Sequence, residues 1–314
     1  MRAFAIFMGL IGLGLLGIAV LAYPAWSLLT AQFDFPFHRV ASRIAMLTLA
    51  VAFLLAIRRM HLDNKTSLGY DLRRPAFLRE LTLGLALGVA MMLPLIGLML
   101  ALDMRELRPG VTLDLGTFIS LTVKGLTSGL VVALIEETFL RGAMHSAIAR
   151  ESGARVAVLL TAVVYSATHF IGKYRIPADA VNAGSGLDML AAVLDKFAEP
   201  MLIDDAFLAL AAVGVLLGLV RSLTGNIAAC IGLHAGWVWV ITFVRETSTP
   251  NEASPVAFLL SRFDGFVGWM VLAWTIVMGA VLYRFYSCRA AAGVGVTRPQ
   301  LDAGSSTRGA RAAR

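Results

Sequence analysis

The sequence has few charged residues for its length. Only 15% of its 314 residues are Asp, Glu, Lys or Arg, whereas 58% are hydrophobic and the mean hydropathy is +0.78. Soluble domains typically carry roughly 25% charged and roughly 45–50% apolar residues. This shortage of charge argues against an ordinary soluble globule and predicts a membrane protein.

Cysteine is scarce as well, since Cys230 and Cys288 are the two in the chain. They form neither the spaced sets that bind metals nor a disulfide framework, so we interpret both as small apolar packing residues. The sequence also shows no internal repeat, and an inverted-repeat transporter therefore has no positive support.

Long apolar runs, in contrast, are frequent. A bilayer core about 30 Å thick needs about 20 apolar residues in a helix. The candidate spans are Ala3–Trp26, Ile44–Ile57, Leu81–Leu102, Phe118–Leu140, Val156–Ile171, Phe207–Val220, Ile227–Val244 and Phe266–Tyr283. The second, fifth and sixth are short. The sequence thus predicts an all-α polytopic membrane helix bundle with about eight transmembrane helices, or seven as the alternative. The first run is too long for a secretory signal, so we expect it to be retained.

The chain divides into four predicted regions. N-terminal transmembrane helices occupy 1–117, a core with the chemistry described below occupies 118–244, and a last loop and helix occupy 245–286. Residues 287–314 are mostly Gly, Ser, Ala and Arg without periodicity, which is typical of a disordered basic tail. Within the loop from Gly172 to Asp205, the apolar spacing of Leu187–Ala198 predicts an amphipathic helix on the membrane surface.

The formal net charge of +7 favours membrane orientation over nucleic-acid binding. The basic residues lie mostly between apolar runs and do not cluster on one soluble face. With an inner N-terminus and eight spans, seventeen of the 27 Lys and Arg residues fall in inner segments and nine in outer ones. Because basic residues are retained on the cytoplasmic side, we expect both ends there. The prediction is a multi-pass protein of the cell membrane, which is the inner membrane in a Gram-negative cell.

The fourth span contains two adjacent glutamates in the stretch VVALIEETFLRG. Ionised side chains at a helix centre cost about 2.5–3.5 kcal/mol each, so buried ones are functional by default and usually paired. Glu137 and Arg141 are four residues apart in the favourable order for an ion pair. Glu136 points about 100° away and lacks that partner, which suits a general base.

Two histidines occupy later spans. His169 lies in VVYSATHFIG, and a turn near Ser152 and Gly153 would bring it to the same depth as Glu136 on antiparallel helices. His234 lies in TGNIAACIGLHAGWVWV, a glycine-bearing segment suited to close helix packing. Since each burial is costly, three polar groups on three spans favour a shared polar cavity.

These motifs resemble those of the CAAX protease and bacteriocin-processing family (CPBP or Abi family) of intramembrane glutamic endopeptidases. EETFLRG is similar to its EExxxR signature, Tyr165 to His169 resembles FxxxH, and His234 resembles the histidine of HxxxN or HxxxD. The resemblance extends over about 118–244. Two positions depart from it, because Tyr165 stands where Phe is usual and Val238 where Asn or Asp is usual.

The resemblance implies a CAAX-type peptidase without a metal or other cofactor. Glu136 activates a water molecule with help from His169, His234 stabilises the oxyanion, and Glu137 with Arg141 orients the site. The implied partners are the lipid bilayer and a membrane-associated peptide or protein substrate, not a nucleic acid. Val238 removes a polar neighbour of His234, so full activity requires Asn226 or Tyr165 to replace it.

Three alternatives stay open. Two His and a Glu are a known ligand set for catalytic zinc, although no H-E-x-x-H pair is present. A non-catalytic immunity or scaffold protein of the same fold would explain Val238. A proton-coupled transporter would use the same Glu and His residues as a relay.

Overall fold

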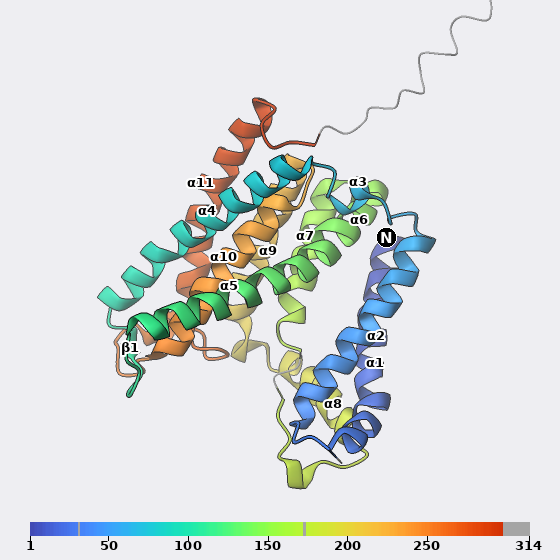
Figure 1. Ribbon diagram of the computed structural model, residues 1–314, viewed down its shortest axis with the longest axis vertical. Coiled ribbons are helices and arrows are strands. Elements are labelled where there is room, and N and C mark those ends of the chain that lie inside the picture. Colours follow the sequence, from blue (N-terminus) through green and yellow to red (C-terminus); the bar gives the residue numbers. More distant parts are fainter. Residues whose placement is uncertain (31, 172–173, 298–314) are drawn as a thin grey trace, which may run out of the picture.

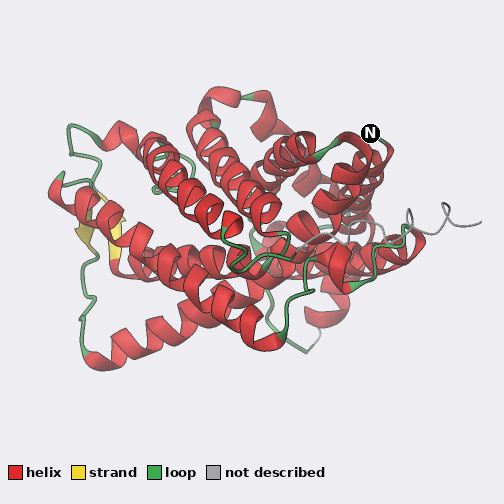
Figure 2. Cartoon of the chain, turned by 90° about the horizontal axis from the view of Figure 1, so that it is seen from above, coloured by secondary structure: helices red, strands yellow, loops and turns green. Residues whose placement is uncertain are grey.

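The computed structural model describes residues 1–30, 32–171 and 174–297, and nearly all of their regular structure is helical (Figures 1 and 2). The long helices are α1 (Arg2–Thr30), α2 (Phe37–Arg59), α4 (Arg74–Ala101), α5 (Leu115–Glu137), α7 (Ala154–Thr168), α9 (Asp204–Thr224), α10 (Ala228–Thr247) and α11 (Trp269–Ala291). Shorter ones are α3 (Lys65–Leu68), α6 (His145–Ser152) and α8 (Ser185–Ala198), with three-residue 3-10 turns at Ala178–Ala180, Pro200–Leu202 and Ala257–Leu259.

The all-α polytopic prediction is confirmed. Seven of the described helices are long and apolar enough to cross a membrane, which matches the alternative count. One of them runs for 38 residues, Leu115–Ser152, because a π-helical segment, Thr138–Met144, joins α5 to α6. The fifth predicted span is α7, whose 15 residues are short for a full crossing.

The helices form two groups that meet near α6 (Figure 1). Helices α1 and α2 pack as a pair, and α8 lies against α1. In the other group α4 and α5 both pack on α10, while α7 and α11 pack on α9. Short strands β1 (Arg105–Leu107) and β2 (Ser248–Pro250) pair antiparallel at the periphery, with Glu106 opposite Thr249 (Figure 2). Most connections between the spans therefore lie at two opposite ends of the bundle.

Glycines bring α4 and α10 into close contact. A Cβ atom at Gly232 would lie 2.1 Å from the Leu81 carbonyl oxygen, and one at Gly84 would lie 2.5 Å from the Ala229 carbonyl oxygen. Gly232 belongs to a small-xxx-small pattern, which allows helix backbones to approach closely in membranes. This close contact fixes how far α10 is shifted along its axis relative to α4. Helix α10 carries His234.

Two segments outside the spans bear on the predictions. The amphipathic helix expected at Leu187–Ala198 is present as α8. The tail was expected to begin at Ser287, but α11 continues to Ala291 and the chain then turns back, so that the Thr297 amide donates to the Thr224 carbonyl (2.8 Å). That boundary is therefore too early, and 298–314 lies outside the described residues. The other domain boundaries stay predictions.

Candidate active site

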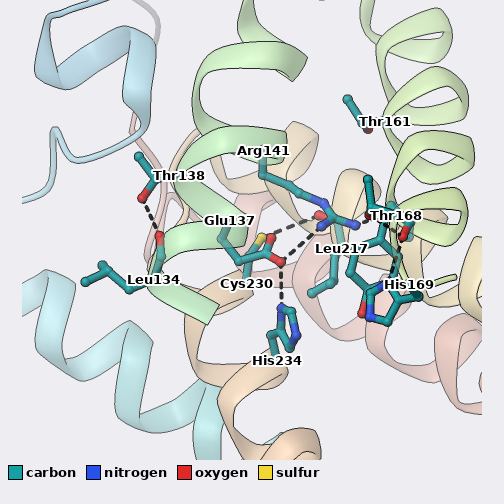
Figure 3. A network of polar contacts seen from close by, with 12 residues as sticks. Leu134, Glu137, Thr138, Arg141, Thr161, Thr168, His169, Leu217, Cys230 and His234 are labelled. Atoms are coloured by element: carbon teal, nitrogen blue, oxygen red, sulfur yellow. Dashed lines mark hydrogen bonds and ion pairs between the residues drawn. The ribbon is translucent and has the colours of Figure 1, made fainter. Parts of the chain in front are cut away.

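Glu137, Arg141 and His234 form a buried polar cluster where α5 ends. Arg141 donates from Nη1 to Glu137 Oε1 at 3.0 Å, so the expected ion pair is present. Nδ1 of His234 donates to the same oxygen at 2.8 Å (Figure 3). Glu137 and Arg141 are fully buried and His234 is 3% exposed. A buried carboxylate that accepts two charge-assisted or polar bonds is held in one orientation.

The second guanidinium nitrogen of Arg141 extends the cluster to α9. Nη2 donates to the Gly214 carbonyl at 3.2 Å. Arg221, in the last turn of α9, donates from Nε to the Arg141 carbonyl at 2.9 Å. The unusual π-helical turn thus has its backbone secured from α9. Segments of this kind occur frequently at functional sites.

Tyr70 also reaches this turn, from the connection between α3 and α4. Its hydroxyl lies 2.6 Å from Thr138 Oγ1, directly after the two glutamates. Burial raises the pKa of Tyr70, the hydrogen bond with Thr138 opposes that rise, and the charge of Glu137 adds to it. No pattern in the sequence pointed to Tyr70, because the contact joins a loop to a span 68 residues later.

Glu136 has a different environment from Glu137. It is half-buried, and its Oε2 atom is buried but has no hydrogen-bond partner among the described residues. Neighbours therefore fix the Glu137 carboxylate more fully than that of Glu136. A buried unpartnered polar atom in a native fold calls for an explanation, and a bound water or substrate group is one.

His169 lies just beyond α7, after the turn at Gly153 that the sequence predicted. Its Nδ1 donates to the Tyr165 carbonyl at 2.7 Å, which sets the tautomer of the neutral ring. The Tyr165 ring lies 4.5 Å from the His169 ring and 5.9 Å from the His234 ring between centroids. The Arg141 guanidinium lies over the same Tyr165 ring at 4.7 Å. Tyr165 thus lies between His169 and the buried cluster that contains His234 and Arg141.

A cavity of about 270 Å³ reaches both histidines. Tyr165, Trp237 and Val238 also line it, so position 238 is an apolar part of the wall next to His234. Asn226 does not compensate for Val238, contrary to the possibility raised above. Its side chain donates to the carbonyls of Thr224 and Gly295 and caps the start of α10.

The donor set does not fit a zinc ion. Among the described residues, no three His, Cys, Asp or Glu side chains are grouped closely enough to hold a metal. The Arg141 guanidinium also occupies the position beside Glu137 Oε1 that a cation would take. Glu137 and His234 bond to each other, whereas zinc ligands direct their lone pairs toward the metal.

The fold and these polar clusters define a polytopic membrane protein with two glutamates at the end of α5, an arginine in the π-helical segment, and two histidines, one just after α7 and one in α10. Residues 118–240 match the family model described as type II CAAX prenyl endopeptidase, Rce1-like. That segment contains all five residues, so the match confirms the resemblance that the motifs suggested. Neither a curated protein nor a solved structure matches the chain. The matched family supports an intramembrane endopeptidase that acts on a membrane-associated peptide or protein.

Proposed function

We propose that the protein is a glutamic intramembrane peptidase of the cell membrane, in which Glu136 activates the attacking water without a metal. The observation that carries the proposal is the difference between the adjacent glutamates. Oε1 of Glu137 accepts from both Arg141 and His234, which hold that carboxylate in place, whereas no such bond is made to Glu136 Oε2 by the described residues; Glu137 Oε2 is likewise without a partner among them. An acceptor of this kind is suited to bind a water molecule and take its proton.

The reaction then proceeds by general base catalysis. Glu136 removes a proton from water, the hydroxide oxygen bonds to the peptide carbonyl carbon, and the carbonyl oxygen becomes an oxyanion. Glu136 returns the proton to the leaving nitrogen as the carbon–nitrogen bond breaks. His169, which lines the cavity, is proposed to orient the water. A general base typically contributes about 10²–10⁴-fold to the rate.

His234 is the proposed stabiliser of the oxyanion. Its Nδ1 proton is committed to Glu137, so it must present Nε2–H to the substrate as an imidazolium. The Glu137 carboxylate fixes its ring, while Arg141 positions the carboxylate. Glu137 and Arg141 are therefore positioning residues. Val238 donates no further hydrogen bond, which predicts a weaker oxyanion site than an amide at this position would give.

One observation favours a second candidate, a non-catalytic membrane protein of the same fold. Val238 lies in the cavity wall where the family motif has Asn or Asp. Loss of a polar group from an otherwise retained site is typical of a protein that has kept the fold without the reaction. The two candidates differ in whether any peptide is cleaved.

The deciding experiment measures cleavage of a library of membrane-associated peptides by the purified full chain in nanodiscs. Wild type is compared with Glu136→Gln, with and without a chelator, and with Glu252→Gln in an exposed loop as the matched control. We expect Glu136→Gln to reduce kcat at least about 100-fold, and the control and the chelator to have no effect. Chelator sensitivity would require a metal. A folded wild type that cleaves nothing would favour the non-catalytic candidate.

A further inference from the structure

A second cluster of charged side chains lies outside the candidate active site, where α4 begins and α11 ends (Figure 1). Glu80 is 1% exposed, and its Oε1 accepts from Arg289 Nη2 at 2.6 Å and from Arg79 Nη2 at 3.5 Å. Further along both helices, the Trp274 indole donates to the Met91 carbonyl at 2.9 Å. The two helices are thus joined at two levels, and one buried carboxylate brings the two guanidinium groups together.

A pocket of about 470 Å³ lies beside this cluster. Arg79, Thr82 and Leu83 line it from α4, whereas Arg289 and Val294 line it from the end of α11 and the turn that follows. The Arg79 side chain is 64% exposed and the Arg289 side chain 23% exposed. The charged residues that line the pocket are therefore both cations, and both are accessible to a ligand.

The carboxylate that holds the two arginines does not line the pocket. A Cβ atom on Gly295 would lie 2.6 Å from the Glu80 carboxyl carbon, so the chain that follows α11 packs against this carboxylate. The Asn226 side chain holds that stretch by donating to the Gly295 carbonyl at 2.9 Å. Because two arginines share one glutamate, the cluster carries one net positive charge.

The pocket lies at the level where α4 becomes apolar. Arg79 is five residues past the start of the helix, which is about 7.5 Å along its axis, and α4 contains no charged residue after Glu80. In α11 the charged residues are Arg284 and Arg289, both toward its end. A basic pocket at the point where two apolar spans end lies at the depth of lipid head groups.

We propose that this pocket binds the phosphate group of an anionic phospholipid, with Arg79 and Arg289 as its ligands. Guanidinium groups form charge-assisted hydrogen bonds to phosphate, often two at a time, and basic pockets between transmembrane helices bind anionic head groups. Leu83 and Val294 provide apolar contacts for the rest of the lipid. The proposal uses none of the residues assigned to the reaction, so it stands or falls independently of peptide cleavage.

The test measures lipid retention by the purified full chain in native mass spectrometry, with phosphatidylglycerol or phosphatidylcholine added in equal amounts. Both lipids contain a phosphate, but only phosphatidylglycerol has a net negative charge. We expect one phosphatidylglycerol per chain, bound at least about tenfold more tightly than phosphatidylcholine. Arg79→Gln removes one charge-assisted contact and should weaken that binding at least about tenfold. Arg59→Gln, exposed in the last turn of α2, is the matched control and should bind like wild type.

A double variant, Glu80→Gln with Arg289→Gln, distinguishes a built site from general attraction between charges. It removes a buried ion pair as a whole, so that no unpaired buried charge remains, and the net charge of the cluster stays at one positive. We expect it to lose binding as Arg79→Gln does, because one of the two guanidinium ligands is gone. Retention at the wild-type level would contradict a site made by two arginines.

Unfolding measurements provide the second readout and show that each variant is folded. Phosphatidylglycerol should raise the unfolding midpoint of wild type and of Arg59→Gln, since a ligand that binds only the folded state stabilises it by mass action. It should not raise the midpoint of Arg79→Gln, and inorganic phosphate at the same concentration should have no effect. The proposal fails if inorganic phosphate acts as strongly as the lipid, if phosphatidylcholine is retained equally, or if folded Arg79→Gln binds like wild type.

Discussion

Replacing Glu137 by Gln should destabilise the fold far more than the same change at Glu136. Gln keeps the size and an acceptor oxygen but removes the negative charge. The Arg141 guanidinium, fully buried and 3.0 Å from Glu137 Oε1, would then have no counter-charge at that position. Removing one partner of a buried ion pair typically costs about 3–5 kcal/mol.

The expected loss of unfolding free energy for Glu136→Gln is much smaller. Glu136 Oε2 has no hydrogen-bond partner among the described residues, and the Arg141 ion pair is made by Glu137. Neutralising a partly buried carboxylate therefore removes a desolvation cost without breaking that pair. We expect the free energy of unfolding to change by less than about 1 kcal/mol, even though the proposed catalytic base is lost.

The assay is reversible unfolding in mixed micelles, followed by tryptophan fluorescence, for wild type and both variants. A double variant, Glu137→Gln with Arg141→Met, tests the cause. It removes both charges, so its loss should be smaller than the sum of the two single losses by about 0.5–3 kcal/mol. Equal losses for the two glutamate variants, or additivity in the double variant, would refute the different roles assigned to Glu136 and Glu137.

The remaining predictions concern packing, the oxyanion site and the loop contact. Gly232→Ala should lower the free energy of unfolding by at least about 1–3 kcal/mol because its methyl group meets backbone, whereas Gly97→Ala, with open space around it, should have almost no effect in the same unfolding assay. Val238→Asn should raise kcat at least about tenfold at an unchanged unfolding midpoint, and a folded variant without that gain would contradict the oxyanion argument. Tyr70→Phe should cost about 1 kcal/mol in wild type and less when Thr138 is already Val, so equal costs would deny the hydrogen bond.

The sequence predicted the spans well because a lipid-exposed backbone must satisfy its hydrogen bonds within each helix. Apolar length alone then identifies the helices. Local geometry also predicted the pair of Glu137 and Arg141, which lie on one helix four residues apart. The same holds for the turn at Gly153, where a positive φ of 85° suits glycine. Each of these features depends on neighbours close in sequence.

Features that depend on distant packing were missed. The hydrogen bond from His234 to Glu137 joins residues 97 positions apart and requires the close approach of α10 to its neighbours. The sequence had assigned that histidine to the substrate alone. Asn226 was considered as a replacement for the motif amide, but it lies two helical turns below His234 and caps α10. Hydropathy and residue spacing in the sequence do not specify how far each helix is shifted along its axis relative to its neighbours.

One layer of residues links stability to the proposed chemistry. Glu137 and Arg141 are costly to bury, and they are stabilised from two other helices: His234 donates to Glu137, the Gly214 carbonyl accepts from Arg141, and Arg221 donates to the Arg141 backbone carbonyl. Glu136 lies at the edge of this layer, where one carboxylate oxygen remains without a partner among the described residues. The interactions that stabilise the buried ion pair of Glu137 and Arg141 therefore also fix the ring of His234.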